Sequence, residues 1–177
     1  MTALTRNPTN TNLLHPNKFS LTFQRLPEMQ YFCQGISIPG ISIGEAPRNT
    51  PFVDLYSPGE KAIYDILNVT FFVDEELRSW LGVHDWLRAL SFPENFEEYL
   101  KLGKQTKFIA NNRTPQFSDA TLTLYSSSYK PYYRFLLYDC FPLSLSSFVM
   151  SASDSPDNPI TADASFRFAY YNVEKLF

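Results

Sequence analysis

Three consecutive acidic residues, Asp74, Glu75 and Glu76, are the side chains of this 177-residue sequence that most resemble an acid/base site. Two neighbouring carboxylates with different pKa values could serve as general acid and general base of a hydrolase. The same three residues stand directly before a run with helical periodicity, where carboxylates cap free amides and are stabilised by the helix dipole. That position lowers carboxylate pKa values, so the cluster predicts a helix start.

The histidines and cysteines lack the spacing of a metal site or of a nucleophile and its base. His84 falls on the apolar stripe of the predicted helix and is predicted to be a core histidine. His15 has no partner nearby in the sequence. Cys33 and Cys140 lie in strand-like runs and belong to no CxxC pair, which predicts two reduced thiols in the core.

Motifs for binding metals, phosphates or nucleic acids are equally weak. Asp154, Asp157 and Asp163 flank the turn sequence SPDNP without the spacing of a calcium loop. The six glycines form no phosphate-binding loop and no GxSxG elbow. Residues 129–134 mix tyrosines with Lys and Arg, but the chain has a net charge of −3, so they indicate an exposed hairpin tip. The sequence therefore predicts no enzyme, no cofactor and no metal site.

Composition indicates one globular domain. Hydrophobic residues make up 44% of the chain and aromatic residues 16%, a composition that favours strands and a large core. The 15 Lys and Arg residues against 18 Asp and Glu residues give a charge of −3, which disfavours stable binding to DNA. The sequence contains no long apolar run and its first fifteen residues lack a signal-peptide core, so we expect a soluble protein made in a cytoplasm.

Alternating apolar and polar residues predict six or seven strands, with candidates at 19–23, 31–36, 63–73, 120–125, 134–140 and 164–171. A helix is predicted over 75–91, with Asp74 as N-cap and an apolar stripe of Leu77, Trp80, Leu81, His84 and Leu87. Residues 93–103 have the pattern of a short second helix, 104–116 and 151–159 read as polar loops, and 143–150 stays open between helix and strand. These elements predict a mainly β (α+β) fold, an antiparallel β-sandwich or barrel with one flanking helix.

The segment 31–62 is apolar and extended, yet it is interrupted by prolines and glycines. It is too long for an ordinary connection and too apolar for disorder. We therefore predict an arm or long hairpin within 36–62 that another copy or a partner covers. Its predicted interface residues are Ile36, Ile38, Ile41, Ile43, Phe52, Val53 and Leu55. Residues 1–17 are predicted as an N-terminal arm, either a contact or a frayed end, and 18–177 as the single domain.

The strand faces that point away from the predicted core carry small neutral polar residues. Such a face suits the wall of a channel that passes a polyanion, because a wall with few cations binds the polyanion only weakly. The alternative is a half-buried face covered by the arm. The candidates for facing a lumen are Ser20, Thr22, Asn68, Thr70, Thr121, Thr123 and Ser165.

The order of these pieces resembles the tail tube protein family of contractile-tailed bacteriophages, with its initiator and terminator relatives. The resemblance rests on NPTNTN (7–12), FQRLPEMQYFCQGISIPGI (23–41), TPFVDLYSPGEK (50–61), NVTFFVDEELRSWLGVHDWLRALSFP (68–93), SDATLTLY (118–125) and FLLYDCFPLSL (135–145). It implies hexameric rings that stack into a tube in the virion tail, with DNA passing through the lumen. It also implies that residues 40–61 reach a neighbour, that the helix faces the sheath, and that sheath and baseplate or neck proteins are partners.

Four functions are consistent with the sequence. The first is a tail tube subunit, which implies many rings per tail, and the second is a single-ring initiator or terminator at a tube end. The third is a monomeric β-sandwich that binds a peptide or carbohydrate with Tyr129, Tyr132 and Tyr133. The fourth, a carboxylate hydrolase, rests only on acidic residues that caps and turns explain.

Overall fold

The computed structural model describes residues 12–91, 94, 96–100, 116–151, 153 and 158–176. Its strands are β1 (Phe19–Phe23), β2 (Cys33–Ser37), β3 (Ile41–Arg48), β4 (Leu55–Tyr64), β5 (Leu67–Phe72), β6 (Ser118–Tyr125), β7 (Pro131–Leu145), β8 (Thr161–Arg167) and β9 (Tyr170–Lys175). Two of its helices are α1 (Met29–Phe32) and α2 (Arg78–Ser91). All strand pairs are antiparallel, which confirms the predicted mainly β fold with a flanking helix.

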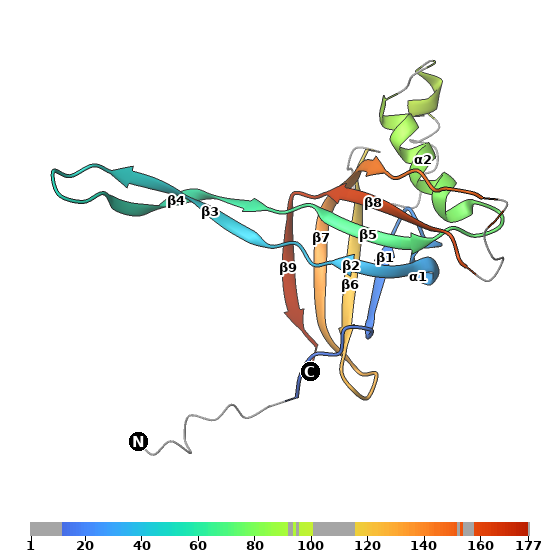
Figure 1. Ribbon diagram of the computed structural model, residues 1–177, viewed down its shortest axis with the longest axis horizontal. Helices are drawn as coiled ribbons and strands as arrows, with labels where there is room; N and C mark the ends of the chain where they lie inside the picture. Colours follow the sequence, from blue (N-terminus) through green and yellow to red (C-terminus); the bar gives the residue numbers. More distant parts are fainter. Residues whose placement is uncertain are drawn as a thin grey trace.

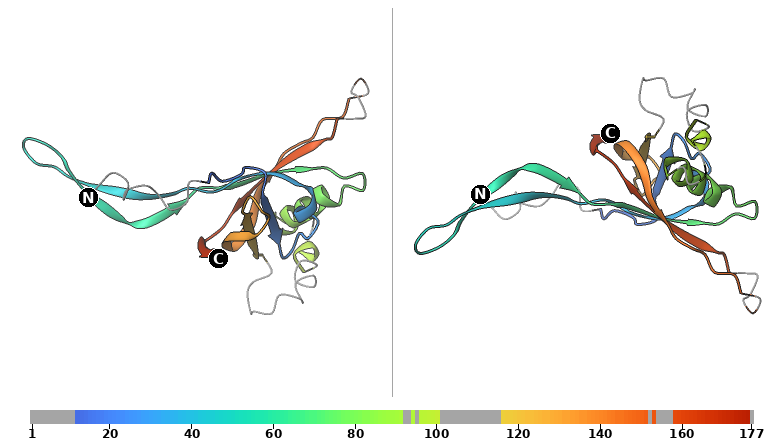
Figure 2. Two further views of the ribbon diagram at one scale, coloured as in Figure 1. Left: turned by 90° about the horizontal axis from the view of Figure 1, so that it is seen from below. Right: turned by 90° about the horizontal axis from the view of Figure 1, so that it is seen from above.

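Two layers of strands cross each other in the body of the molecule (Figure 1). The sheet order is β1-β6-β7-β8-β5-β2, with β9 paired to β7. One layer holds β1, β6, β9 and the first part of β7, and the other holds β8, β5, β2 and the end of β7. Figure 2 shows α2 on the same side of the β8-β5-β2 layer as the other strands.

The core lies between the two layers because alternate residues of each strand point inward. Leu21 of β1 pairs with Leu122 of β6, and both are fully buried. From the other layer, Phe166 reaches Phe23 with ring centroids 4.6 Å apart. The ring centroid of Trp86 in α2 lies 6.2 Å from that of Phe166, so the helix closes the core at one end. The period-two alternation predicted for 19–23 and 120–125 is confirmed.

Strand β7 joins the layers and is longer than predicted. It continues through Phe141 and Pro142, where the sequence predicted its end. The register shifts between Pro142 and Ser144, and such a bulge is a place where a sheet tolerates proline. A second irregularity lies at Asp139, whose φ is 55° and whose N–H donates to Asp119 Oδ1 at 3.1 Å. These two distortions let one strand serve both layers.

Three other predicted strands are divided or shortened in the structure. The predicted strand 63–73 splits, because Asp65 leaves the ladder and its N–H donates to the Gly40 carbonyl at 3.0 Å. The predicted strand 164–171 splits at Ala169, whose N–H donates to Tyr138 O. Helix α1 occupies the first residues of the strand predicted over 31–36. Nine strands are therefore described in place of six or seven.

Helix α2 begins three residues later than predicted, because Leu77 has a left-handed φ of 58°. Asp74 still caps it: its carboxylate accepts from the N–H groups of Arg78 (3.0 Å) and Ser79 (2.9 Å). The buried face was predicted wrongly. It consists of Ser79, Val83, Trp86 and Ala89, about one residue around the helix from the predicted stripe.

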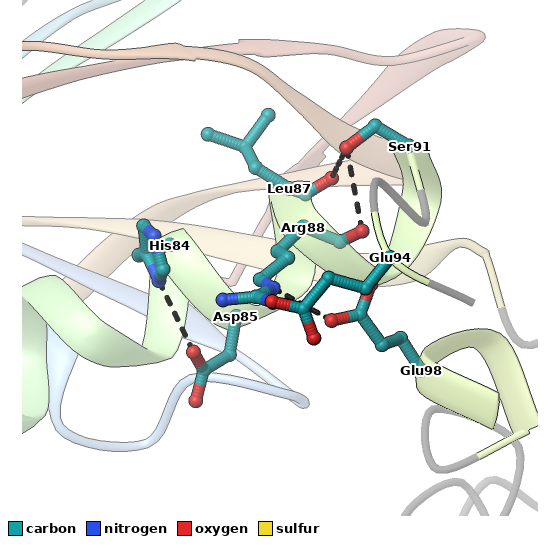
Figure 3. Close-up of polar contacts among 7 residues, drawn as sticks. All are labelled: His84, Asp85, Leu87, Arg88, Ser91, Glu94 and Glu98. Carbon is teal, nitrogen blue, oxygen red and sulfur yellow. Dashed lines mark hydrogen bonds and ion pairs between the residues drawn. The ribbon is translucent and has the colours of Figure 1, made fainter. Parts of the chain in front are cut away.

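His84 is not a core residue, contrary to the prediction. Its side chain is 40% exposed, stacks on Trp80 with centroids 5.0 Å apart, and places Nδ1 3.1 Å from Asp85 Oδ1 (Figure 3). Leu81, also on the predicted stripe, is 40% exposed. Trp80 and Leu87 are only half-buried against the core. The apolar stripe read from the sequence is thus the edge of the buried face.

Residues 97–100 are helical, within the short helix predicted over 93–103. Of 143–150, Leu143 to Leu145 belong to β7 and the rest has no regular structure. The predicted loop residues 104–115, Asp154 and Asp157, and residues 1–11 of the predicted arm lie outside the described residues.

Candidate functional site

The most unusual surface is the hairpin of β3 and β4, which projects far from the body (Figures 1 and 2). The two strands pair only with each other, as a separate two-stranded sheet. Every residue of β3 is exposed, and eight of the ten residues of β4 are exposed. Because an isolated two-stranded ribbon is at best marginally stable in water, this hairpin needs a surface to lie on. The long hairpin predicted from the sequence is confirmed as a structure, and its role stays a prediction.

Six of the seven predicted interface residues are exposed on or beside this hairpin. Phe52 is 98% exposed at the tip. The others are Ile38, Ile41, Ile43, Val53 and Leu55. Ile36 differs, because it is half-buried, pairs with Val69 in the β2–β5 ladder and packs on the core of its own chain.

Tyr56, Ile63 and Ile66 are further exposed apolar residues that sequence reasoning did not select. Tyr56 and Ile63 lie in β4, and Ile66 follows it. The sequence analysis placed Ile63 and Ile66 in one predicted strand over 63–73, which the structure divides at Asp65.

The two strands of the hairpin approach each other closely at Gly44 and Gly59. A Cβ atom at Gly59 would lie 2.5 Å from the Gly44 carbonyl oxygen, so residue 59 has no room for a side chain. The register shifts between Ile43 and Glu45 at the same point. Glycine at position 59 therefore allows the close approach of the two strands at this irregularity.

The seven predicted lumen residues lie in two groups. In the first layer Ser20 pairs with Thr123, and Thr22 with Thr121. The second layer holds Asn68, Thr70 and Ser165, where Ser165 Oγ donates to Asn68 Oδ1 at 2.8 Å. Since the core lies between the layers, these groups are on different outer faces, and a single lumen can be lined by only one of them.

These faces also carry charges that the sequence analysis did not assign to them. Arg134 of β7 is opposite Thr123, and Glu174 of β9 is opposite Arg134. Thr70 Oγ1 donates to Asp163 Oδ1 at 2.6 Å. The description of nearly uncharged faces is therefore corrected, because cross-strand neighbours distant in sequence add ions of both signs.

The acidic residues at 74–76 have a structural role in helix α2. Burial by itself would raise the pKa of Asp74, but hydrogen bonds from Ser79 and Arg78 hold it below the ordinary value. Ser79 Oγ donates to Asp74 Oδ1 at 2.6 Å. Glu76 forms an exposed ion pair with Arg78. These contacts assign the predicted acid cluster to helix capping.

A second polar cluster, around Arg88, ties the segment after α2 back to the helix (Figure 3). The guanidinium lies 2.6 Å from Glu94 Oε1 and donates from Nε to Glu98 Oε1 at 2.6 Å. Hydrogen bonds to Glu98 and Glu94 raise the pKa of Arg88. Ser91 Oγ donates to the helix carbonyls of Leu87 and Arg88. These contacts hold Glu94 and Glu98 against the helix, which is a structural role.

The two cysteines are free thiols, as predicted. Cys140 is fully buried and Cys33 is half-buried. Burial raises the pKa of Cys140 to about 12 and that of Cys33 to about 11. Both groups are therefore held as thiols, a form with little nucleophilic character.

Among the described residues, no three His, Cys, Asp or Glu side chains are grouped to hold a metal ion. The helices within these ranges are all too short or too polar to cross a membrane.

The comparisons with known proteins agree with this geometry. The tail tube terminator protein of Enterobacteria phage T4 is 30% identical over 150 residues, which cover 80% of this chain and 76% of that protein. This chain belongs to the tail tube protein family of contractile-tailed bacteriophages. The family predicted from the sequence is thereby confirmed, although no protein-family model matches the chain.

Solved structures show how widely this family's fold extends. A chain of the tube-terminating cap of the anti-feeding prophage matches with a TM-score of 0.61 at 12% identity, over 99% of both chains. A chain of the sheath/tube terminator structure of the extracellular contractile injection system PVC matches with a TM-score of 0.63 at 13% identity. That match covers 94% of this chain and 99% of the other. At these identities the likeness establishes the fold alone.

Proposed function

We propose that this chain is a tail tube terminator, a non-enzymatic structural protein that forms one ring at the end of a tail tube. The observation that carries the proposal is the β3–β4 hairpin, whose apolar side chains its own fold leaves in water. Its relative from phage T4 supports the terminator, the alternative from the sequence analysis, over the repeated tube subunit that was predicted first.

The shape of the subunit supports the ring. The hairpin leaves one end of the body, and we propose that its contact surface on a neighbour is a different patch. Such a heterologous contact closes into a ring when the rotation between copies closes. From the family we propose six copies, a lumen through which DNA passes, and a place in the virion tail next to sheath and tube proteins.

The apolar hairpin residues provide the first test. Phe52→Asp with Val53→Asp and Leu55→Asp should convert rings into monomers, because each residue would lose about 1.5 to 3 kcal/mol of burial and gain an unpaired charge. Native mass spectrometry and negative-stain electron microscopy would measure the change. The matched control is Phe52→Leu with Val53→Ile and Leu55→Met, which keeps an apolar surface and should still assemble.

Three results would contradict the proposal. Normal assembly of the aspartate variant would show that the hairpin is not the contact. A wild-type protein that stays monomeric at high concentration would instead favour the β-sandwich binding module. Long tubes grown from the purified wild-type protein would favour the tube subunit over the terminator.

A further inference from the structure

A hollow of about 420 Å³ lies at the base of the hairpin, where β2 leads into β3 and β4 leads into β5. Three isoleucines line it, and each is partly exposed: Ile38 (42%), Ile63 (53%) and Ile66 (37%). Exposed isoleucines grouped in a concave surface are a feature of binding sites rather than of ordinary protein surface.

The hollow also contains one side chain of each charge. Arg167, the last residue of β8, lines it together with Asp65. Across the described part of the chain, neither side chain has an ion pair. The hollow therefore suits a ligand that presents apolar groups together with charges of its own.

The tip of the hairpin has this chemistry. Phe52, Val53 and Leu55 are exposed by 98%, 63% and 53%, and Asp54 lies between them in the sequence. Arg48 is the cross-strand partner of Leu55, so a cation stands on the opposite strand at the same level. Within the described ranges Asp54 and Arg48 form no ion pair either.

We infer that the hollow receives the hairpin tip of a second copy, with Asp54 facing Arg167 and the apolar tip residues on the isoleucines. The tip of the same chain cannot occupy the hollow, because the hairpin carries it to the far end of the molecule (Figure 1). This inference rests on the proposed function and adds the acceptor site. Apolar burial supplies the affinity, and the charges fix the orientation of the tip.

Each copy then donates one tip and offers one hollow. Such a contact uses two different surfaces, so it propagates from copy to copy until a ring closes. Strand β3 has eight residues and spans roughly 26 Å at about 3.3 Å per residue. Neighbouring subunits are therefore displaced by about the length of the hairpin.

A charge reversal tests the pairing. Asp54→Arg and Arg167→Glu should each weaken self-association by about tenfold or more, because each leaves like charges facing each other. The double variant restores an opposite pair and should return self-association to within about threefold of the wild type. Sedimentation velocity over a concentration series measures association, and circular dichroism checks that these exposed substitutions leave the fold intact.

The matched control combines Asp54→Arg with Lys130→Glu, which reverses a cation in the β6–β7 turn and should not rescue assembly. Single variants that assemble normally, or a double variant that stays as weak as the singles, would overturn the inference. In either case, loss of assembly in the aspartate variant of Phe52, Val53 and Leu55 would leave the proposed function standing. If that variant also assembles normally, both proposals fail.

Discussion

At the scale of single residues, side chains that looked chemically competent prove to be structural. Asp74 shows this best, because its two carboxylate oxygens accept from the amides of Arg78 and Ser79. Leu77 holds a left-handed backbone just before the helix, so the first amides of α2 face Asp74 across that turn. The carboxylate thus determines where the helix starts.

Replacement of this cap gives a prediction with a defined pH dependence. Asp74→Asn should lower the free energy of unfolding by about 1 kcal/mol at neutral pH, because asparagine has one acceptor oxygen for the two amides of Arg78 and Ser79. The pKa of Asp74 is lowered in the folded protein, so its contribution is complete above the unfolded-state pKa of about 4 and is lost as the pH falls through the folded value. Urea unfolding at several pH values would measure this.

The stability difference between Asp74→Asn and wild type should therefore be constant from pH 7 to about 5 and shrink below about 4. Glu75→Gln is the matched control, since it removes the same charge one residue from the cap and should change stability by less than about 0.5 kcal/mol. A difference that stays constant down to pH 2 would contradict the ionic role of Asp74.

At the scale of elements, the body contains the buried core and the hairpin lies outside it. The buried core contains no residue between Ile41 and Ile63, so the body should fold without the hairpin. The bases of the two strands are adjacent, because Ile41 and Tyr64 are cross-strand partners and Asp65 N–H donates to Gly40 O. A two-residue turn can join them.

We expect a variant in which Asn-Gly replaces residues 42–63 to be a folded monomer with cooperative thermal unfolding. The reason is that the deletion removes exposed ribbon and leaves the ladder from β2 to β5 in place. Size-exclusion chromatography with light scattering and a thermal melt followed by circular dichroism would measure both properties. An unfolded product would show that the hairpin stabilises its own domain.

At the scale of the whole molecule, the number of copies per tail distinguishes a terminator from a tube subunit. If the chain ends the tube, quantitative mass spectrometry of purified virions should find about six copies per tail, one ring by the proposed symmetry. A tube subunit would be several times more abundant, because it would occupy many rings. The ratio to a single-ring baseplate protein provides the internal standard.

Periodicity in the sequence predicted much of the fold for a physical reason. In a two-layer β protein each strand buries alternate residues, so β1 and β6 could be read directly from Leu21, Phe23, Ala120 and Leu122. The hairpin was also predictable, because apolar residues between prolines and glycines fit neither a loop nor disorder. The family followed from the order of these same segments.

Only the tertiary structure decided which residues share a surface. It divided the polar residues of the strands between two outer faces, continued β7 through Pro142 by a bulge, and rotated the buried face of α2 toward Trp86. It also brought Arg167 to Ile38 and Ile63, which are far apart in the chain. Periodicity reports which side of an element is apolar, but register, strand crossing and neighbouring segments depend on contacts between distant residues.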